Sequence, residues 1–96
     1  MKNEVCDKLI HRENRVEDGS SYTYELTYRE ASEVAAFRLP LYSVKVTMTT
    51  SDGRCREATA RDIFSNRAKA RDFFDMLVRN LATPIDLGYV VEDELG

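Results

Sequence analysis

Residues 41–61, with the sequence LYSVKVTMTTSDGRCREATAR, have the pattern of two β-strands joined by a tight turn. Apolar side chains recur at every second position of the first arm, at Tyr42, Val44, Val46 and Met48. A period of two is typical of a strand with one buried face. Asp-Gly between two such runs is a strong turn signal. We therefore predict an antiparallel hairpin of residues 41–50 and 54–61.

The length of the loop sets the register of this hairpin. A loop of two residues turns Ala58 and Ala60 toward solvent, whereas a loop of three residues, 51–53, places Val46 opposite Ala58 on the buried face. Because a slip of one residue exchanges the two faces of a strand, the apolar pattern selects between these registers. We predict the three-residue loop, a type I turn with Gly53 in a left-handed G1 bulge.

An earlier hairpin is predicted around Glu17-Asp18-Gly19. Its second arm carries four apolar or aromatic residues on one face, Tyr22, Tyr24, Leu26 and Tyr28. Its first arm, residues 5–14, alternates poorly and is charged, which favours a place at the edge of the sheet. Residues 31–39 are compatible with a helical turn, a strand extension or a loop.

A long helix is predicted over residues 66–80, capped by Ser65 or Asn66. Its apolar residues have the spacing of one helical face, at Ala70, Phe73, Phe74, Leu77, Val78 and Leu81. We expect Phe73, Phe74 and Leu77 to cover the Val44 and Val46 face of the sheet, along with Met48.

A short second helix begins at Thr83-Pro84-Ile85-Asp86, where Thr83 is the N-cap, Pro84 is at N1 and Asp86 approximates a capping box. Its apolar stripe consists of Leu87, Val90, Val91 and Leu95. Strands followed by helices predict an α+β fold. We expect a single domain spanning residues 1–96, with an antiparallel β-sheet of about four strands, one long amphipathic helix packed on it and a short C-terminal helix.

Composition excludes several classes of protein. The chain has 96 residues, a net charge of −3 and two cysteines, which are too few for a disulfide scaffold. No run of about 20 apolar residues and no secretory signal is visible, so we expect a cytoplasmic protein without a membrane contact. An acidic balance argues against general nucleic-acid binding.

No nucleotide-binding, hydrolase, zinc-protease or C-x-x-C motif occurs, and we expect no catalytic residues, no cofactor and no metal. His11 is expected to be a solvated histidine of an edge strand. Cys55 lies between Arg54 and Arg56, and neighbouring cations lower the pKa of a thiol. Adjacent strand residues face opposite ways, so an ordinary strand cysteine is the simpler interpretation.

The C-terminal segment, residues 83–95 with the sequence TPIDLGYVVEDEL, resembles a family of short bacterial proteins that carry T-P-x-x-L-x-x-V-V-E-D near the C-terminus. Asp62-Ile63-Phe64-Ser65 is similar to the helix entry of that family. The family is a domain of unknown function, so the resemblance implies a small bacterial module and no particular activity.

For function, the sequence favours a non-enzymatic protein-interaction or regulatory module whose partner is another protein or a second copy. The residues expected at the contact are Leu87, Val91, Glu92, Asp93 and Glu94. The alternative is a weak nucleic-acid-binding domain that uses the basic stretch from residue 54 to residue 71. Its contacts would be Arg54, Arg56, Arg61, Arg67 and Arg71.

Overall fold

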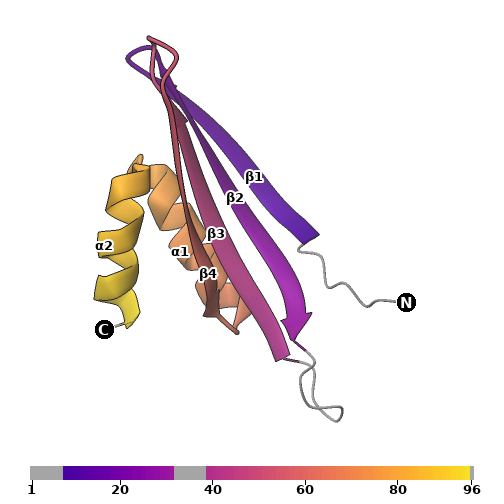
Figure 1. Cartoon of the computed structure of the whole chain (residues 1–96). Coiled ribbons are helices and arrows are strands. Elements are labelled where there is room, and N and C mark those ends of the chain that lie inside the picture. The colour runs from indigo at the N-terminus through magenta and orange to yellow at the C-terminus, as the bar shows by residue number, and fades with distance from the viewer. Residues whose placement is uncertain (1–7, 32–38, 96) are drawn as a thin grey trace.

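The computed structural model describes residues 8–31 and 39–95 (Figure 1). The elements are β1 (Lys8–Glu17), β2 (Ser20–Ala31), β3 (Leu39–Thr49), β4 (Cys55–Phe64), α1 (Arg67–Arg79) and α2 (Pro84–Leu95). The strands form one antiparallel sheet in the order β1-β2-β3-β4. Both helices lie on the same face of this sheet, which confirms the predicted α+β architecture.

The β3–β4 hairpin has the predicted register. Val46 pairs with Ala58, and Val44 pairs with Ala60. The Gly53 N–H donates to the Thr50 carbonyl at 2.9 Å, and Gly53 has a φ of +92°. A left-handed backbone at this point is what a glycine adopts without strain. The apolar pattern therefore selected the correct register.

The first hairpin turns at Asp18 and Gly19, whose φ values are +52° and +80°. β1 (Lys8–Glu17) lies at the edge of the sheet, as predicted, and it extends beyond the predicted end at residue 14. Its register with β2 shifts between Leu9 and His11. This bulge explains the poor alternation, because an extra residue reverses the facing of those that follow. Residues 5–7 and 32–38, on which further expectations fell, lie outside the described residues.

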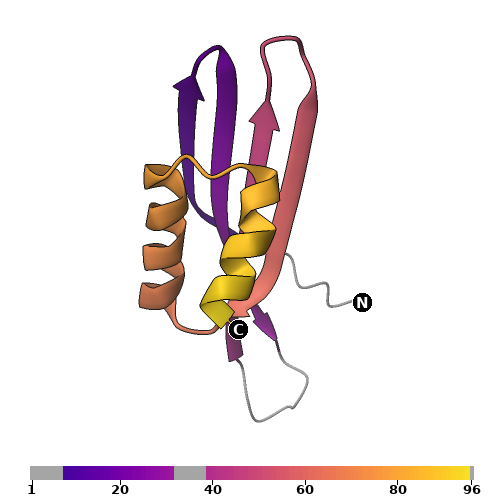
Figure 2. The same cartoon turned by 90° about the vertical axis from the view of Figure 1, so that its left-hand side faces the viewer.

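The two helices divide the width of the sheet between them. α1 packs mainly over β2, and α2 packs mainly over β4 (Figure 2). The predicted stripe of Phe73, Phe74 and Leu77 shares one core with Val44 and Val46, and α2 covers the β4 side of the sheet. A helix with its side chains is about 10–12 Å wide, so one helix cannot cover strands spaced about 4.8 Å apart across the whole sheet.

The hydrophobic core lies between the helices and the sheet. It consists of Tyr24, Leu26, Tyr42, Val44, Val46, Ala70, Phe73, Phe74, Leu77, Ala82 and Leu87. The Asn66 side chain caps α1 by accepting from the Lys69 N–H at 3.0 Å. At the other end of α1, Arg15 of the edge strand donates to the Val78 carbonyl at 2.7 Å. These caps hold α1 in place over the first hairpin.

Over the described ranges, neither helix has the length and apolar character needed to cross a bilayer.

Candidate functional site

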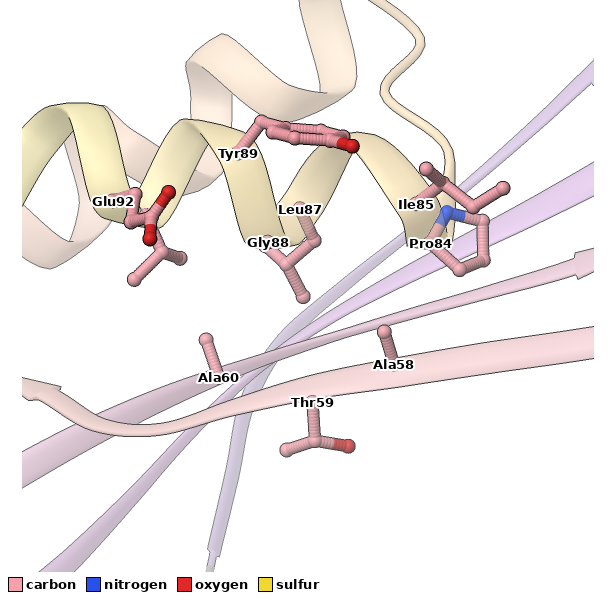
Figure 3. Close-up of a pocket in the computed structure, with 10 residues that line it drawn as sticks. Ala58, Thr59, Ala60, Pro84, Ile85, Leu87, Gly88, Tyr89 and Glu92 are labelled. Atoms are coloured by element: carbon pink, nitrogen blue, oxygen red, sulfur yellow. The ribbon is translucent and has the colours of Figure 1, made fainter.

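A groove of about 540 Å³ runs between α2 and the last strand of the sheet (Figure 3). One wall is α2, and the floor is β4. Its lining consists of Ala58, Thr59, Ala60, Pro84, Ile85, Leu87, Gly88, Tyr89, Val91 and Glu92. Most of these residues are apolar or small, so the groove offers a hydrophobic surface beside the edge of the sheet.

Hydrogen bonds at the start of α2 fix the position of this wall of the groove. The Thr83 hydroxyl accepts from the Asp86 N–H, and Asp86 accepts from the Thr83 N–H, each at 3.1 Å. This reciprocal pair is the predicted capping box. Leu87 then anchors the inner face of the helix in the core. The outer face carries Ile85, which is 61% exposed, and Tyr89, which is 70% exposed.

The floor of the groove consists of small side chains. Ala58 and Ala60 lie on the helix-covered face of β4, opposite Val46 and Val44, and both are half-buried. Figure 3 shows both methyl groups pointing from the strand toward α2. Their small size keeps the groove open between the strand and the outer part of the helix.

The outer edge of β4 offers backbone groups that no other described strand pairs. The Thr50 N–H donates to the Arg54 carbonyl at 2.8 Å, so the backbone of Arg54 faces β3. This facing alternates along an antiparallel ladder. The residues of the regular part of β4 that direct N–H and C=O away from β3 are therefore Cys55, Glu57 and Thr59.

β4 bends at Asp62, a residue that the sequence analysis treated only as part of a helix entry. Asp62 has a φ of +54°, and its N–H donates to the Ser43 hydroxyl at 2.8 Å. Its carboxylate accepts from Arg29 Nη2 at 2.6 Å and from Arg29 Nε at 3.0 Å. The Arg29 hydrogen bonds hold the pKa of Asp62 below its ordinary value. The regular edge of β4 therefore ends just before this clamp.

The face of the sheet opposite the helices is polar, and many of its charges are paired across strands. Arg12 Nη2 donates to Glu25 Oε2 at 2.7 Å. Lys45 Nζ lies 3.2 Å from Glu57 Oε1. With the Arg29–Asp62 pair, these contacts connect all four strands. Because these charged side chains bind one another, fewer of them are available to bind a charged ligand on that face.

The residues predicted for a protein contact differ in their exposure. Leu87 is 2% exposed and belongs to the core, and it also lines the base of the groove. It lies on the face of α2 that packs on the sheet, whereas the outer face begins with Ile85. Val91 is half-buried, and both it and the exposed Glu92 line the groove. The side chains of Asp93 and Glu94 lie outside the described part of the structure.

Exposed Ile85 and Tyr89, which the sequence analysis did not select, complete this wall. On a helical wheel with Leu87 at the buried side, both residues fall on the exposed side of α2.

The arginines of the nucleic-acid alternative do not form one patch. Arg54 and Arg56 lie at the turn end of β4, whereas Arg67 begins α1 beyond the other end of that ten-residue strand. A strand of this length spans about 33 Å. Arg71 Nε donates to Asp75 at 3.0 Å on α1, which packs mainly over β2. Arg61 is exposed on β4 itself.

His11 differs from the expected solvated edge residue. Because of the β1 bulge, it faces the helices, and its ring makes an edge contact with Phe74 at a centroid distance of 5.3 Å. Cys55 is exposed and carries a free thiol. Within the described ranges, no group of three or more His, Cys, Asp and Glu residues is arranged to hold a metal ion.

No curated protein and no solved structure matches the chain significantly. A family model, described as a family of unknown function (DUF6514), matches residues 2–96. The predicted resemblance to a domain of unknown function is confirmed. The match spans the strands, both helices and the groove between β4 and α2, so the whole chain belongs to this family of unknown function, DUF6514.

Proposed function

We propose that this protein is a non-enzymatic protein-interaction module that binds a polypeptide along the outer edge of β4. The observation that carries this proposal is a strand edge that no other strand of the described ranges pairs, with an apolar groove directly beside it. Backbone groups at a sheet edge bind an added strand, and an adjoining groove receives its side chains.

The two edges of the sheet differ in their suitability for such an addition. β1 is bulged near Ile10 and charged along much of its length, features that protect an edge from pairing. β4 has the uncharged run Ala58, Thr59 and Ala60 at its centre. Exposed Ile85 and Tyr89 stand above this run on α2. Binding at β4 therefore combines backbone hydrogen bonds with burial of apolar surface.

Site-directed photo-crosslinking tests the proposal. A photoreactive phenylalanine replaces Tyr89, which is 70% exposed beside the groove. The matched control carries the same group at Val16, which is 71% exposed on β1. We expect a covalent polypeptide adduct from position 89 in cells of the source organism, and none from position 16.

The adduct must also depend on the strand edge. Thr59→Pro removes an N–H that faces away from β3, and proline is tolerated at such edge positions. We expect this variant to lose the adduct from position 89 while its circular dichroism is unchanged. Absence of a polypeptide adduct at position 89, or an adduct that survives Thr59→Pro, would overturn the proposal. An adduct with nucleic acid would favour the alternative based on the arginines.

A further inference from the structure

Resting on the proposed function, we infer that the polypeptide added to β4 is the β4 strand of a second copy of this chain. The two strands pair antiparallel about a two-fold axis at Thr59, and the two sheets become one continuous sheet. The inference depends on the charge order of β4, the facing of its backbone, and the composition of the α2 wall.

The charge order of β4 is complementary to itself when the strand is reversed. Residues 56–62 have the sequence REATARD. Pairing centred on Thr59 places Glu57 opposite Arg61 of the second copy, and the symmetry repeats this pair. By alternation along the strand, both side chains lie on the face away from the helices. Opposite charges facing each other across two strands stabilise the pairing.

Other centres do not give this complementarity. Centring the pair on Glu57 or on Arg61 would oppose like charges. Centring it on Ala58 would place Glu57 opposite Thr59, and centring it on Ala60 would place Arg61 opposite Thr59. Of these centres, only Thr59 opposes the carboxylate of Glu57 to the guanidinium of Arg61. Asp62 contributes little to this register, because Arg29 already holds it.

The facing of the backbone allows the same register. Glu57 and Thr59 direct their N–H and C=O groups away from β3, as derived from the Thr50–Arg54 hydrogen bond. In a hydrogen-bonded pair of antiparallel strands, each of the two opposed residues donates its N–H to the C=O of the other, so both must face the partner strand. Thr59 against Thr59 therefore forms a hydrogen-bonded pair at the axis. Glu57 lies opposite Arg61 on either side of this central pair.

The outer face of α2 leaves room for the α2 helix of the second copy near the two-fold axis. Gly88 is exposed in the middle of the helix, and a Cβ added there would meet no atom within 4 Å. A glycine inside a helix is less favourable than an alanine, and nothing that the described residues show requires a glycine here. Ile85 and Tyr89 flank it and are both exposed. In the dimer, the small Ala58–Ala60 pairs bring the two α2 helices toward each other over the axis.

The existing partner of Glu57 is compatible with this arrangement. Lys45 Nζ lies 3.2 Å from Glu57 Oε1, and the two side chains are 40% and 59% exposed. A carboxylate accepts more than two hydrogen bonds. Glu57 therefore keeps Lys45 of its own chain while accepting from Arg61 of the second copy.

Charge exchange across the axis tests the inference. Sedimentation equilibrium of the wild-type chain is expected to give twice the 11.0 kDa chain mass. Glu57→Lys and Arg61→Glu should each raise the dimer Kd about tenfold, since each opposes like charges twice. The double variant, Glu57→Lys with Arg61→Glu, restores opposite charges in this register and should return the Kd to within about threefold of wild type.

Two further variants keep the test specific. Glu17→Lys makes the same charge change on the exposed end of β1 and should leave the Kd unchanged. Thr59→Pro should give a folded monomer, verified by circular dichroism and by cooperative urea unfolding. A wild-type chain that stays monomeric up to about 1 mM would overturn the inference. Failure of the double variant to recover dimerisation would overturn it as well.

The outcomes separate this inference from the proposed function. In one outcome, the chain is monomeric while position 89 crosslinks to a different polypeptide and Thr59→Pro abolishes that adduct. This result would overturn pairing with a second copy and support the proposed function. If the chain is monomeric and position 89 gives no polypeptide adduct, both are overturned.

Discussion

At the scale of single residues, Tyr24 connects the sheet to the joint between the helices. Its side chain is 0% exposed, and its hydroxyl donates to the Ala82 carbonyl at 2.7 Å. Ala82 follows Leu81, whose φ of +52° lets the chain leave α1 and turn toward α2. A single phenol therefore helps to fix where α2 begins.

We expect Tyr24→Phe to lower the free energy of unfolding by about 1–3 kcal/mol, because the buried Ala82 carbonyl loses its donor. Urea unfolding measures this change. Tyr28→Phe is the matched control, since the Tyr28 hydroxyl donates to the Glu30 carboxylate at a partly buried site. An equal loss in both variants would contradict a special role for Tyr24.

The same substitution should change the response to alkaline pH. Burial raises the pKa of Tyr24 to about 12 from its ordinary 10.0. A raised pKa means that the neutral phenol contributes stability fully below pH 10. That contribution is lost as the pH rises from about 10 through about 12. The phenylalanine variant should therefore lose less stability over this window than the wild type.

At the scale of elements, α2 has a stabilised first turn and a residue in its interior that lowers helix stability. The capping box of Thr83 and Asp86 stabilises its first turn, whereas Gly88 weakens its middle. We expect Gly88→Ala to raise the free energy of unfolding of the monomer by about 0.5–1 kcal/mol, because the added Cβ enters open space. Urea unfolding at several protein concentrations separates this gain from any effect on association. A loss of monomer stability would show that Gly88 serves the isolated fold.

The elements also differ in how far their structure followed from local sequence. The β3–β4 register was predictable because Ala58 and Ala60 must share a face with Val46. The start of α2 was predictable because a capping box is a contact between near neighbours. The β1 bulge at Ile10 was not predictable, because it lies at the open end of its hairpin, away from the turn that the sequence marks. The left-handed Asp62 was not either, because it is held by Arg29 and Ser43, which lie 33 and 19 residues away. The groove was only partly predicted: Leu87, Val91 and Glu92 line it, but exposed Ile85 and Tyr89 were missed.

At the scale of the whole molecule, the Arg29–Asp62 pair joins β2 to β4 across the strand between them. The Arg29 hydrogen bonds lower the pKa of Asp62 below its ordinary 3.8. A lowered pKa means that the ionised carboxylate contributes stability above pH 4 or so, which is lost as the pH falls through the folded-state pKa.

We therefore expect Asp62→Asn to cost about 1–2 kcal/mol at pH 7 and to flatten the fall in stability below about pH 4. Thermal unfolding measured between about pH 2 and pH 7 records both effects. Asp72→Asn removes one exposed carboxylate from α1 and serves as the control. If the stability of the Asp62→Asn variant fell at acid pH as steeply as that of the wild type, the Arg29–Asp62 pair would not be the source of this stability.

The order of the strands has a consequence for synthesis on the ribosome. Each strand after β1 pairs with the strand that precedes it in the chain, so the complete sheet can assemble once β4 has emerged. Hairpins form in about 1–10 μs, whereas translation adds only about 5–20 residues per second. α2 ends about 30 residues after β4, so it is the last element of the fold to be made. Until α2 docks, the newly made chain presents a finished sheet with part of its hydrophobic face uncovered, which makes it a substrate for chaperones that bind near the exit tunnel.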